Sequence, residues 1–323
     1  MKAAVVYQRG EMPQYTEFSE PLVKNEDELL ITVKAAAIKH FDKGRAKGTH
    51  YSADANNKEN ATVIGGDGVG LLADGTRVFA LGAGMIAEKA IIDKRKMVKL
   101  PDGIDDITAA ALPNAVAGSA MALRFRAGMK PGETVLINGA TGFTGKIAIQ
   151  VAKHYGAKKI IVTGRNPETL QTLFALGADE TVLTTQTDEN FIAQIKEIHN
   201  NIPIDVIIDY LWGHTAELIL ASLKGNGSFT HKTRFVSIGS VTGDKIQLSA
   251  ENLRSVDLQL SGSGLGSWTK EEMKKLFSEI IPEMFQLAAD GKLKAETVSV
   301  SLTDIEKLWD MEVADGKRMV VTM

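Results

Sequence analysis

Three glycines between an apolar run and an amphipathic segment are the strongest chemical signal in the sequence. Gly139, Gly142 and Gly145 follow the run Thr134–Asn138 in VLINGATGFTGKIAIQ. Glycines let the backbone approach a pyrophosphate, and a helix beginning there offers unpaired N–H groups to the anion. Ala140 stands at the first glycine of the dinucleotide pattern G-x-G-x-x-G, and a tight turn without a ligand is the alternative. The strand before and the helix after favour a dinucleotide site made of Ala140, Thr141, Gly142, Phe143, Thr144 and Gly145.

The residues after the next apolar run bear on which dinucleotide binds. Enzymes that use NAD place an Asp or Glu there, which accepts hydrogen bonds from the adenosine ribose. This chain has Gly164, Arg165 and Asn166 instead. A guanidinium can grip a 2'-phosphate with two charge-assisted hydrogen bonds, and Gly164 leaves room for it. The sequence therefore favours NADPH; the alternative is that Arg165 is a solvated surface residue and Glu168 complements the dipole of the following helix.

Elements that would position these residues alternate regularly from Thr134 to Ser263. Short apolar runs and segments of helical period follow one another, as in the βαβ units of a parallel sheet. Asn166 before Pro167 predicts a helix start, and Asp188 is expected to cap the next helix. The expected strands are Thr134–Asn138, Ile160–Thr163, Glu180–Thr184, Asp205–Tyr210, Phe235–Ile238 and Leu258–Ser261.

The remainder of the chain has a different pattern and predicts a second domain. Short alternating strands separated by Gly, Asp and Asn fill the first hundred or so residues, which indicates a mainly β lobe. A helix that buries Leu276, Ile280 and Phe285 follows the βαβ region, and the closing strand RMVVTM is expected to return to the first lobe. We therefore predict an α/β protein in which a doubly wound domain, 116–263, is inserted into a domain made of 1–115 and 264–323.

Composition narrows the function further. The 323 residues are 44% hydrophobic and 24% charged, as in ordinary globular proteins. The net charge of -3 and the lack of a long Lys/Arg run argue against nucleic acid. A cysteine count of zero removes disulfides, thiolate nucleophiles and Cys-based zinc sites. No apolar segment reaches bilayer length and the N-terminus has no signal-peptide pattern, so we expect a cytoplasmic protein without a membrane partner.

Several segments together resemble a known family over nearly the whole chain. They are LPNAVAGSAMAL from Leu112, RAGMKPGETVLINGATGFTGKIAIQVAKHYGA, IDVIIDYLWG and FVSIGS. In order and spacing they are similar to the zinc-independent quinone oxidoreductase branch of the medium-chain dehydrogenase/reductase superfamily. The resemblance implies a GroES-like catalytic lobe, an inserted Rossmann domain for NADPH, and a homodimer formed through the edge of that domain's sheet. The A-x-G-x-x-G form of the turn is usual in this branch.

The resemblance also bears on metal binding. Zinc-dependent members of the superfamily hold a catalytic metal with a Cys after the third strand and a Gly-His-Glu turn further on. This chain has Lys39 at the first place and Gly66 with Asp67 at the second. Neither place offers a thiolate or an imidazole, so no zinc ligand set forms there. We expect no metal, and acceptor polarisation by protein donors.

Two residues are candidates for the chemistry. Tyr51 matches a tyrosine that lies near the substrate pocket in the resembled branch, where its hydroxyl can hydrogen-bond or protonate the product oxygen. The alternative is a loop aromatic that packs on the lobe. The Lys39 ammonium can offset negative charge that develops during hydride transfer, and the alternative is a contact to cofactor phosphate or ribose. His40 and Asp42 follow on the same turn and are read as solvated.

By the same resemblance, Ile238, Gly239, Ser240 and Ser263 line the nicotinamide side, and Gly118 stands where the branch commonly has Thr. The resulting hypothesis is an NADPH-dependent reductase of quinones or α,β-unsaturated carbonyl compounds. A protein of another class, which binds NADPH as a redox sensor or structural subunit without turnover, is the alternative. The sequence does not name the acceptor.

Overall fold

The computed structural model describes residues 1–50, 61–228 and 230–323 and divides the chain into two compact units. Unit 1 consists of Met1–Pro113 and Phe277–Met323, and unit 2 is Asn114–Leu276. Unit 2 thus extends past Ser263, the residue at which the sequence analysis placed the domain boundary, to Leu276. An ion pair within unit 2 joins this last stretch to the rest of the unit: Arg126 donates to both carboxylate oxygens of Glu272, at 3.2 and 2.8 Å.

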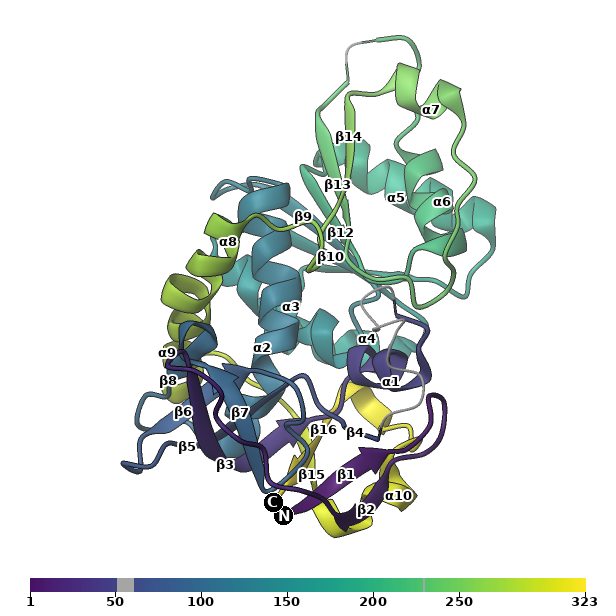
Figure 1. The fold of residues 1–323 in the computed structure, drawn as a ribbon. Helices are drawn as coiled ribbons and strands as arrows, with labels where there is room; N and C mark the ends of the chain where they lie inside the picture. Colours follow the sequence, from purple (N-terminus) through teal and green to yellow (C-terminus); the bar gives the residue numbers. More distant parts are fainter. Residues whose placement is uncertain (51–60, 229) are drawn as a thin grey trace. The chain divides into compact units, whose positions relative to one another are not determined.

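Unit 2 contains a six-stranded sheet in which all pairings are parallel (Figure 1). Along the sheet the strand order is β11-β10-β9-β12-β13-β14. The predicted doubly wound α/β domain is confirmed. The strands are β9 (Thr134–Asn138), β10 (Lys159–Gly164), β11 (Glu180–Leu183), β12 (Val206–Asp209), β13 (Thr233–Ser237) and β14 (Leu258–Gly262).

Helices connect these strands, and four of them, α4, α5, α7 and α8, begin at a residue whose side chain caps the helix. Asn166 accepts a hydrogen bond from the Thr169 N–H at 2.9 Å, as predicted for its helix. The predicted cap at Asp188 is wrong by one residue, because Thr187 caps that helix and Asp188 instead pairs with His214 at 2.9 Å. The helices are α3 (Phe143–His154), α4 (Pro167–Thr172), α5 (Asp188–Asn201), α6 (Gly213–Ser222), α7 (Ala250–Ser255) and α8 (Lys270–Lys275).

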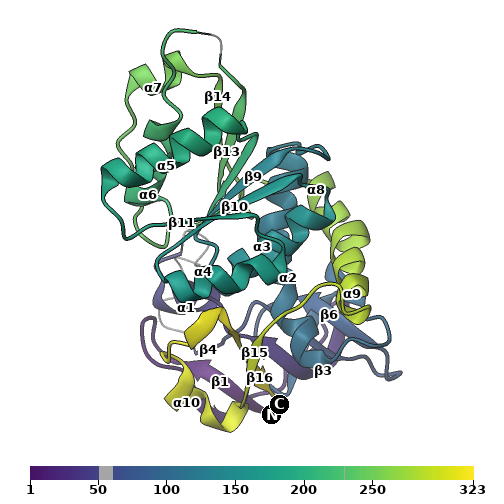
Figure 2. The same cartoon turned by 180° about the vertical axis from the view of Figure 1, so that it is seen from behind.

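The core of unit 2 forms where helices cover the sheet. Helices α5 and α6 pack their apolar stripes on one face, and α3 lies on the other (Figures 1 and 2). Phe191, Ile195 and Ile198 of α5 have the helical spacing that the sequence indicated, and all three are buried. Because both faces are covered, the strands are continuous apolar runs, and the polar residues that end them stand out.

Unit 1 is mainly β, as predicted. Its sheets have the orders β2-β1-β4 and β15-β16-β3-β5-β6-β8, with β7 paired to β3. The closing strand β16 pairs antiparallel with β3, which confirms the predicted return. The strands are β1 (Lys2–Val6), β2 (Gln14–Glu17), β3 (Glu28–Ala37), β4 (Thr62–Val63), β5 (Asp67–Leu71), β6 (Arg77–Leu81), β7 (Lys89–Asp93), β8 (Met97–Lys99), β15 (Thr297–Ser301) and β16 (Arg318–Thr322).

Unit 1 also carries helices, and the predicted burial of Leu276, Ile280 and Phe285 near the later ones is confirmed. The boundary between the units lies inside one helix, at Pro113. The helices of unit 1 are α1 (His40–Lys47), α9 (Ile281–Ala289) and α10 (Ile305–Leu308), and α2 (Asp106–Met121) begins in unit 1 and ends in unit 2. π-Helical turns lie at Ala122–Arg126 in unit 2 and at Leu276–Ile280, where the chain returns to unit 1.

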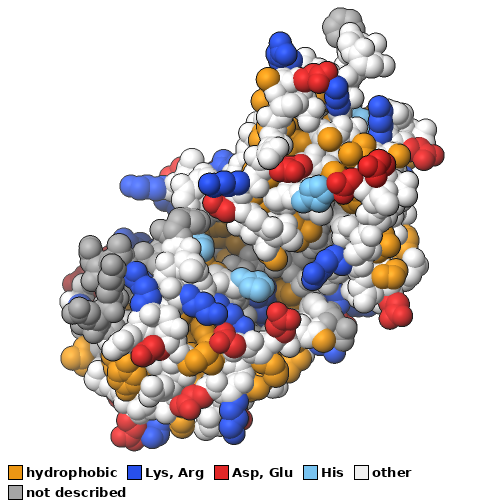
Figure 3. Space-filling view, turned by 90° about the vertical axis from the view of Figure 1, so that its right-hand side faces the viewer, with side chains coloured by type: hydrophobic (Ala, Val, Ile, Leu, Met, Phe, Trp, Pro, Cys, Tyr) orange, Lys and Arg blue, Asp and Glu red, His pale blue; other side chains and the backbone are white. Residues whose placement is uncertain are grey.

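The surface carries charges of both signs. On the face drawn in Figure 3, Lys and Arg side chains alternate with Asp and Glu rather than forming one basic band. In the described part of the chain, no helix combines the length and the apolar character that a membrane crossing needs. The cytoplasmic location stays a prediction.

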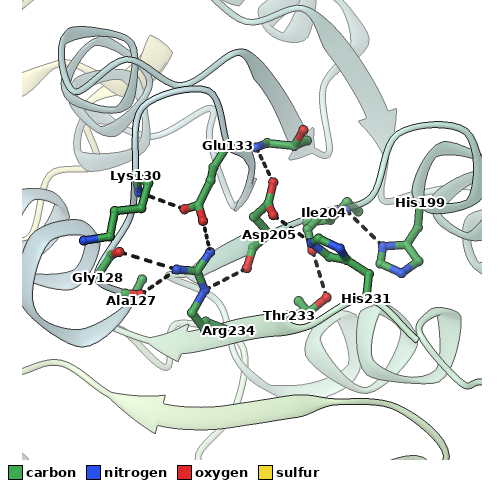
Figure 4. A network of polar contacts seen from close by, with 11 residues as sticks. Ala127, Gly128, Lys130, Glu133, His199, Ile204, Asp205, His231, Thr233 and Arg234 are labelled. Carbon is green, nitrogen blue, oxygen red and sulfur yellow. Dashed lines mark hydrogen bonds and ion pairs between the residues drawn. The ribbon is translucent and has the colours of Figure 1, made fainter. Parts of the chain in front are cut away.

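Charged side chains cluster at the amino ends of β9, β12 and β13 (Figure 4). Arg234 donates to Glu133 at 2.6 Å and to the carbonyl of Ala127 at 2.9 Å. Asp205 accepts the N–H of Thr134 at 2.7 Å. This network joins the starts of three neighbouring strands.

His199 belongs to the same end of the sheet and is half-buried. Its Nδ1 accepts the N–H of Ile204 at 3.1 Å, which requires an unprotonated Nδ1. Burial lowers the pKa of His199, the nearby His231 lowers it further, and Asp205 opposes both. The folded protein therefore disfavours protonation of this imidazole.

We expect the free energy of unfolding to fall as the pH drops below about 6.5, the pKa of an unfolded histidine, because the unfolded state then binds a proton that folded His199 resists. Urea unfolding at pH 7.5 and 5.5 measures the loss, and it should shrink in a His199→Gln variant. At pH 7.5, His199→Ala should cost about 1–3 kcal/mol, because the buried Ile204 N–H loses its acceptor. An unchanged pH dependence in His199→Gln would contradict this account.

Candidate functional site

The glycine-rich turn lies at the carboxyl end of β9, between β9 and α3. Strand β9 has β10 on one side and β12 on the other, so the strand order reverses direction there. In open α/β sheets, ligands bind at this reversal point. Gly139 has φ +86°, a left-handed conformation that glycine tolerates, and Gly142 precedes α3 without a side-chain cap. The structure thus places the predicted residues 140–145 together at the expected edge.

Two of the glycines are required by close packing. A Cβ on Gly145 would lie 2.5 Å from the Cα of Ala140, so the turn could not keep its path. A Cβ on Gly164, at the end of β10, would lie 2.4 Å from Cγ2 of Thr141. By contrast, Gly142 has open space within 4 Å and is exposed. The absence of a side chain at Gly142 therefore leaves the outer side of the turn open, and an anion would approach the turn from that side.

A chain of buried hydrogen bonds supports the turn from below. The Thr163 hydroxyl donates to Oδ1 of Asn138 at 2.6 Å and accepts the N–H of Gly139 at 3.1 Å. Nδ2 of Asn138 donates to Asp209 at 2.7 Å. Each of these three side chains belongs to the end of a different strand, β10, β9 and β12. They fix the carboxyl ends of three adjacent strands relative to one another.

Asp209 continues this chain into the next turn. Its carboxylate accepts the N–H groups of Leu211 and Trp212, both at 3.0 Å. Burial raises the pKa of Asp209, while these hydrogen bonds and that from Asn138 oppose the rise. Trp212 has φ +59°, and no other non-glycine residue has a positive φ in the described part of the chain. Such a conformation costs on the order of 1–3 kcal/mol and persists where surrounding contacts impose it.

Sequence reasoning did not select Asn138 and Asp209. The available signal was a polar residue that ends an otherwise apolar buried strand, VLIN in one case and VIID in the other. At the carboxyl edge of a parallel sheet, such residues face the ligand side or support it.

The three residues proposed to select the cofactor follow β10. Arg165 is exposed, and no hydrogen bond or ion pair engages its side chain within the described ranges. The Asn166 side chain is occupied by its capping hydrogen bond to Thr169. No carboxylate stands directly at this strand end, since Glu168 lies in the first turn of α4. Arg165 is thus available to an anionic ligand.

Residues expected on the nicotinamide side follow β13 and β14. The N–H groups of Ile238 and Gly239 donate to the Asp209 carbonyl at 2.7 and 3.2 Å. Ser240 is exposed. Ser263 is buried and its hydroxyl accepts the indole N–H of Trp268 at 3.0 Å. All four lie at the same carboxyl edge as the glycine-rich turn.

Gly118 of α2 lies where these elements meet. A Cβ there would lie 3.5 Å from Ile238 and 3.9 Å from Thr144 and from the ring of Tyr210, which are ordinary contacts. A small side chain would therefore fit. Burial strongly raises the pKa of the neighbouring Tyr210, Asp209 adds to the rise, and Ser119 opposes it. The phenol stays protonated and is a hydrogen-bond donor at this edge.

Lys39, the candidate from unit 1, is buried at the junction of β3 and α1. Its ammonium pairs with Asp67 and with Asp42. Burial opposes the charge of Lys39, but these two carboxylates outweigh burial and raise the pKa of Lys39. Asp42 is buried too, so the reading of Asp42 as solvated is wrong. Tyr51 lies outside the described residues.

Comparisons with known proteins agree with this architecture. A family model described as zinc-binding dehydrogenase matches residues 144–281. A probable NADPH-dependent quinone reductase, tdiC of Emericella nidulans, is 26% identical over 96% of both chains. Over nearly its whole length the chain is therefore similar to a quinone reductase, and part of it matches the model of a dehydrogenase family.

Solved structures and larger relatives extend the likeness. A mycobacterial quinone oxidoreductase has a TM-score of 0.84 at 21% identity, with 100% of both chains covered. Escherichia coli quinone oxidoreductase complexed with NADPH has a TM-score of 0.81 at 22% identity, with 99% of this chain and 100% of that chain covered. The polyketide synthase GfsB of Streptomyces halstedii is 31% identical over 83% of this chain, which spans only 4% of that synthase.

The family model's description names zinc, and the residues of this chain do not fit that metal. In residues 1–50, 61–228 and 230–323, no three His, Cys, Asp or Glu side chains gather as a metal site would require. At the two places that hold metal in zinc-dependent members, the structure has Lys39 and Asp67 paired with each other. No step of the chemistry is therefore assigned to zinc.

The packing of the turn predicts different results for two glycine substitutions. Gly145→Ala should lower the free energy of unfolding by about 1–3 kcal/mol, because the new methyl group overlaps the Ala140 backbone. Gly142→Ala should change it by less than about 0.5 kcal/mol, because its surroundings are open. Urea unfolding of both variants measures the difference. Equal losses in the two variants would show that the turn is not held as described.

Proposed function

We propose that this chain is an NADPH-dependent oxidoreductase that transfers hydride to a quinone or to an α,β-unsaturated carbonyl compound. The observation that carries the proposal is the place of the glycine-rich turn: it lies at the strand-order reversal, and Gly142, which precedes α3, is exposed with open space around it. Backbone N–H groups in such a turn suit a diphosphate. The similar protein tdiC is a probable NADPH-dependent quinone reductase, and the similar Escherichia coli enzyme is known in complex with NADPH, so both relatives point to the same cofactor.

Arg165 supports NADPH over NADH. Its exposed guanidinium has no described partner within the chain, and it directly follows β10, where the adenosine ribose of a dinucleotide would lie. A guanidinium forms paired, charge-assisted hydrogen bonds with a phosphate. Gly164 keeps the approach clear, because any side chain there would meet Thr141.

The bound cofactor would supply a hydride. Ile238, Gly239, Ser240 and Ser263 are proposed to line the nicotinamide side, and the Tyr51 hydroxyl to hydrogen-bond or protonate the product oxygen. Hydride transfer between flat rings depends on orientation and on stabilising the developing oxyanion. Neither requirement calls for a metal, so we propose zinc-independent chemistry.

A homodimer formed through β14 is part of the proposal. β14 is the last strand of the parallel sheet in Figure 1, and its neighbour in the sheet is β13. Leu260 on this strand is 37% exposed. The outer edge of a last strand can pair with the same strand of a second copy, and an exposed leucine there would be buried by that pairing.

Cofactor preference tests the role of Arg165. Quenching of Trp fluorescence should show tighter binding of NADPH than of NADH. Arg165→Glu should weaken NADPH binding roughly 10- to 100-fold, since a charge-assisted contact is lost and a like charge is introduced. Arg254→Glu makes the same charge change on exposed α7 and serves as the control. Equal affinities for the two cofactors in the wild type would refute the selectivity argument.

An acceptor screen tests turnover separately from binding. Loss of NADPH absorbance at 340 nm should accompany reduction of at least one quinone, enone or enal, and EDTA should leave the rate unchanged. Gly142→Ala should lose most of this activity while keeping its stability, because the methyl group stands where the diphosphate must approach. Tight NADPH binding without oxidation by any acceptor would favour a redox sensor or structural subunit.

A further inference from the structure

Unit 1 contains a buried cluster of four charged side chains that the dinucleotide site does not use. We call Lys39, Asp42, Asp67 and Arg318 the Lys39 cluster; their exposures are 3, 4, 5 and 8%. Asp42 belongs to α1, Asp67 begins β5 and Arg318 begins β16. The cluster holds two formal positive and two formal negative charges. Burying charges is costly unless they compensate one another.

Every N–H of the Lys39 ammonium has an acceptor. Nζ lies 3.1 Å from the carbonyl oxygen of Ala37, 3.0 Å from Oδ2 of Asp42, and within hydrogen-bond distance of Oδ1 of Asp67. An ammonium has three N–H donors, so these three oxygens use all of them. None is left to donate to a substrate oxygen.

The same contacts fasten two segments that are distant in sequence. Asp42 accepts the backbone N–H of Lys39 through Oδ2 and that of Gly66 through Oδ1, both at 3.0 Å. Asp67, the residue after Gly66, pairs with the Lys39 ammonium. Arg318 contacts the carbonyl of Ile38 at 3.4 Å. The ammonium therefore lies between the β3–α1 junction and the start of β5, and holds them together.

These two segments are the ones where zinc-dependent relatives carry metal ligands, and here the residue types do not fit zinc. We propose that the Lys39 ammonium is a built-in cation that takes the structural place of a metal ion between the β3–α1 junction and β5. Lys39 is then a positioning residue that acts through Asp42 and Asp67, not a proton donor. This inference does not depend on the proposed reductase activity, because its tests read stability and metal content.

Charge balance gives the first test. Lys39→Met keeps roughly the length of the side chain but leaves two buried carboxylates with Arg318 as the one cation of the cluster. The thermal midpoint should therefore fall by more than about 6 °C. Lys39→Arg should recover part of the loss by restoring the charge. The double variant Lys39→Met/Asp67→Asn, which removes one charge of each sign, should recover at least half of it. Lys307→Met, at an 82% exposed side chain, is the matched control and should shift the midpoint by less than about 1 °C.

Metal rescue gives the second test. Lys39→Ala removes the cation and leaves Asp42 and Asp67 with oxygen ligands that suit Mn²⁺. At millimolar MnCl₂ this variant should gain at least about 3 °C and bind close to one Mn²⁺ per chain by elemental analysis. Wild type and Lys39→Ala/Asp67→Asn should show neither effect.

The proposal would be overturned if Lys39→Met were as stable as the wild type. It would also be overturned if Lys39→Ala took up no Mn²⁺, or if Mn²⁺ stabilised the wild type as much as it stabilises Lys39→Ala. Should neither single variant fold, the charge-balanced double variant decides. If the double variant folds, the proposal is supported, because removing one buried carboxylate restores the stability that was lost with the Lys39 charge. Its failure to fold contradicts the proposal.

Discussion

The carboxyl ends of β9, β10 and β12 depend on one constraint: the buried polar side chains that end these strands need hydrogen-bond partners. The chain meets it with three side chains, Thr163, Asn138 and Asp209, linked at 2.6 and 2.7 Å. Thr163 and Asn138 each donate and accept a hydrogen bond, and Asp209 accepts from Asn138 and from two backbone N–H groups, so none of the three side chains can move alone. The glycine-rich turn rests on this network through the N–H of Gly139, and so its shape is set before any ligand arrives.

The architecture of unit 2 could be predicted because local signals agree with one another. Apolar runs alternate with helical segments, and Asn166 before Pro167 marks a helix start, so the order of strands and helices could be predicted. The glycine-rich turn could be predicted because its glycines stand between a predicted strand and a predicted helix. The misplaced cap at Asp188 has a simple cause: Thr187 and Asp188 are both good caps, and only the backbone shows which of them precedes the first turn.

What could not be predicted is which polar residues meet in space. Lys39 and Asp67 are 28 positions apart, and their pairing follows from how β3 and β5 align, which no local pattern contains. The sequence suggested a solvated Asp42 because its neighbours are polar. In the structure, the two N–H groups that Asp42 accepts compensate for burial of its carboxylate. Likewise, the burial of His199 follows from the Ile204 N–H that turns back toward it.

The backbone of Trp212 is held in a strained conformation. Its positive φ would ordinarily favour glycine, yet the Asp209 carboxylate holds its N–H and that of Leu211. The next residue, Gly213, also has a positive φ, so a tight reversal separates β12 from α6. Asp209 thus serves two turns at once, the glycine-rich turn through Asn138 and this reversal directly. Loss of its carboxylate would remove hydrogen bonds from both turns at once. One buried acid therefore supports two neighbouring turns at the carboxyl edge of the sheet.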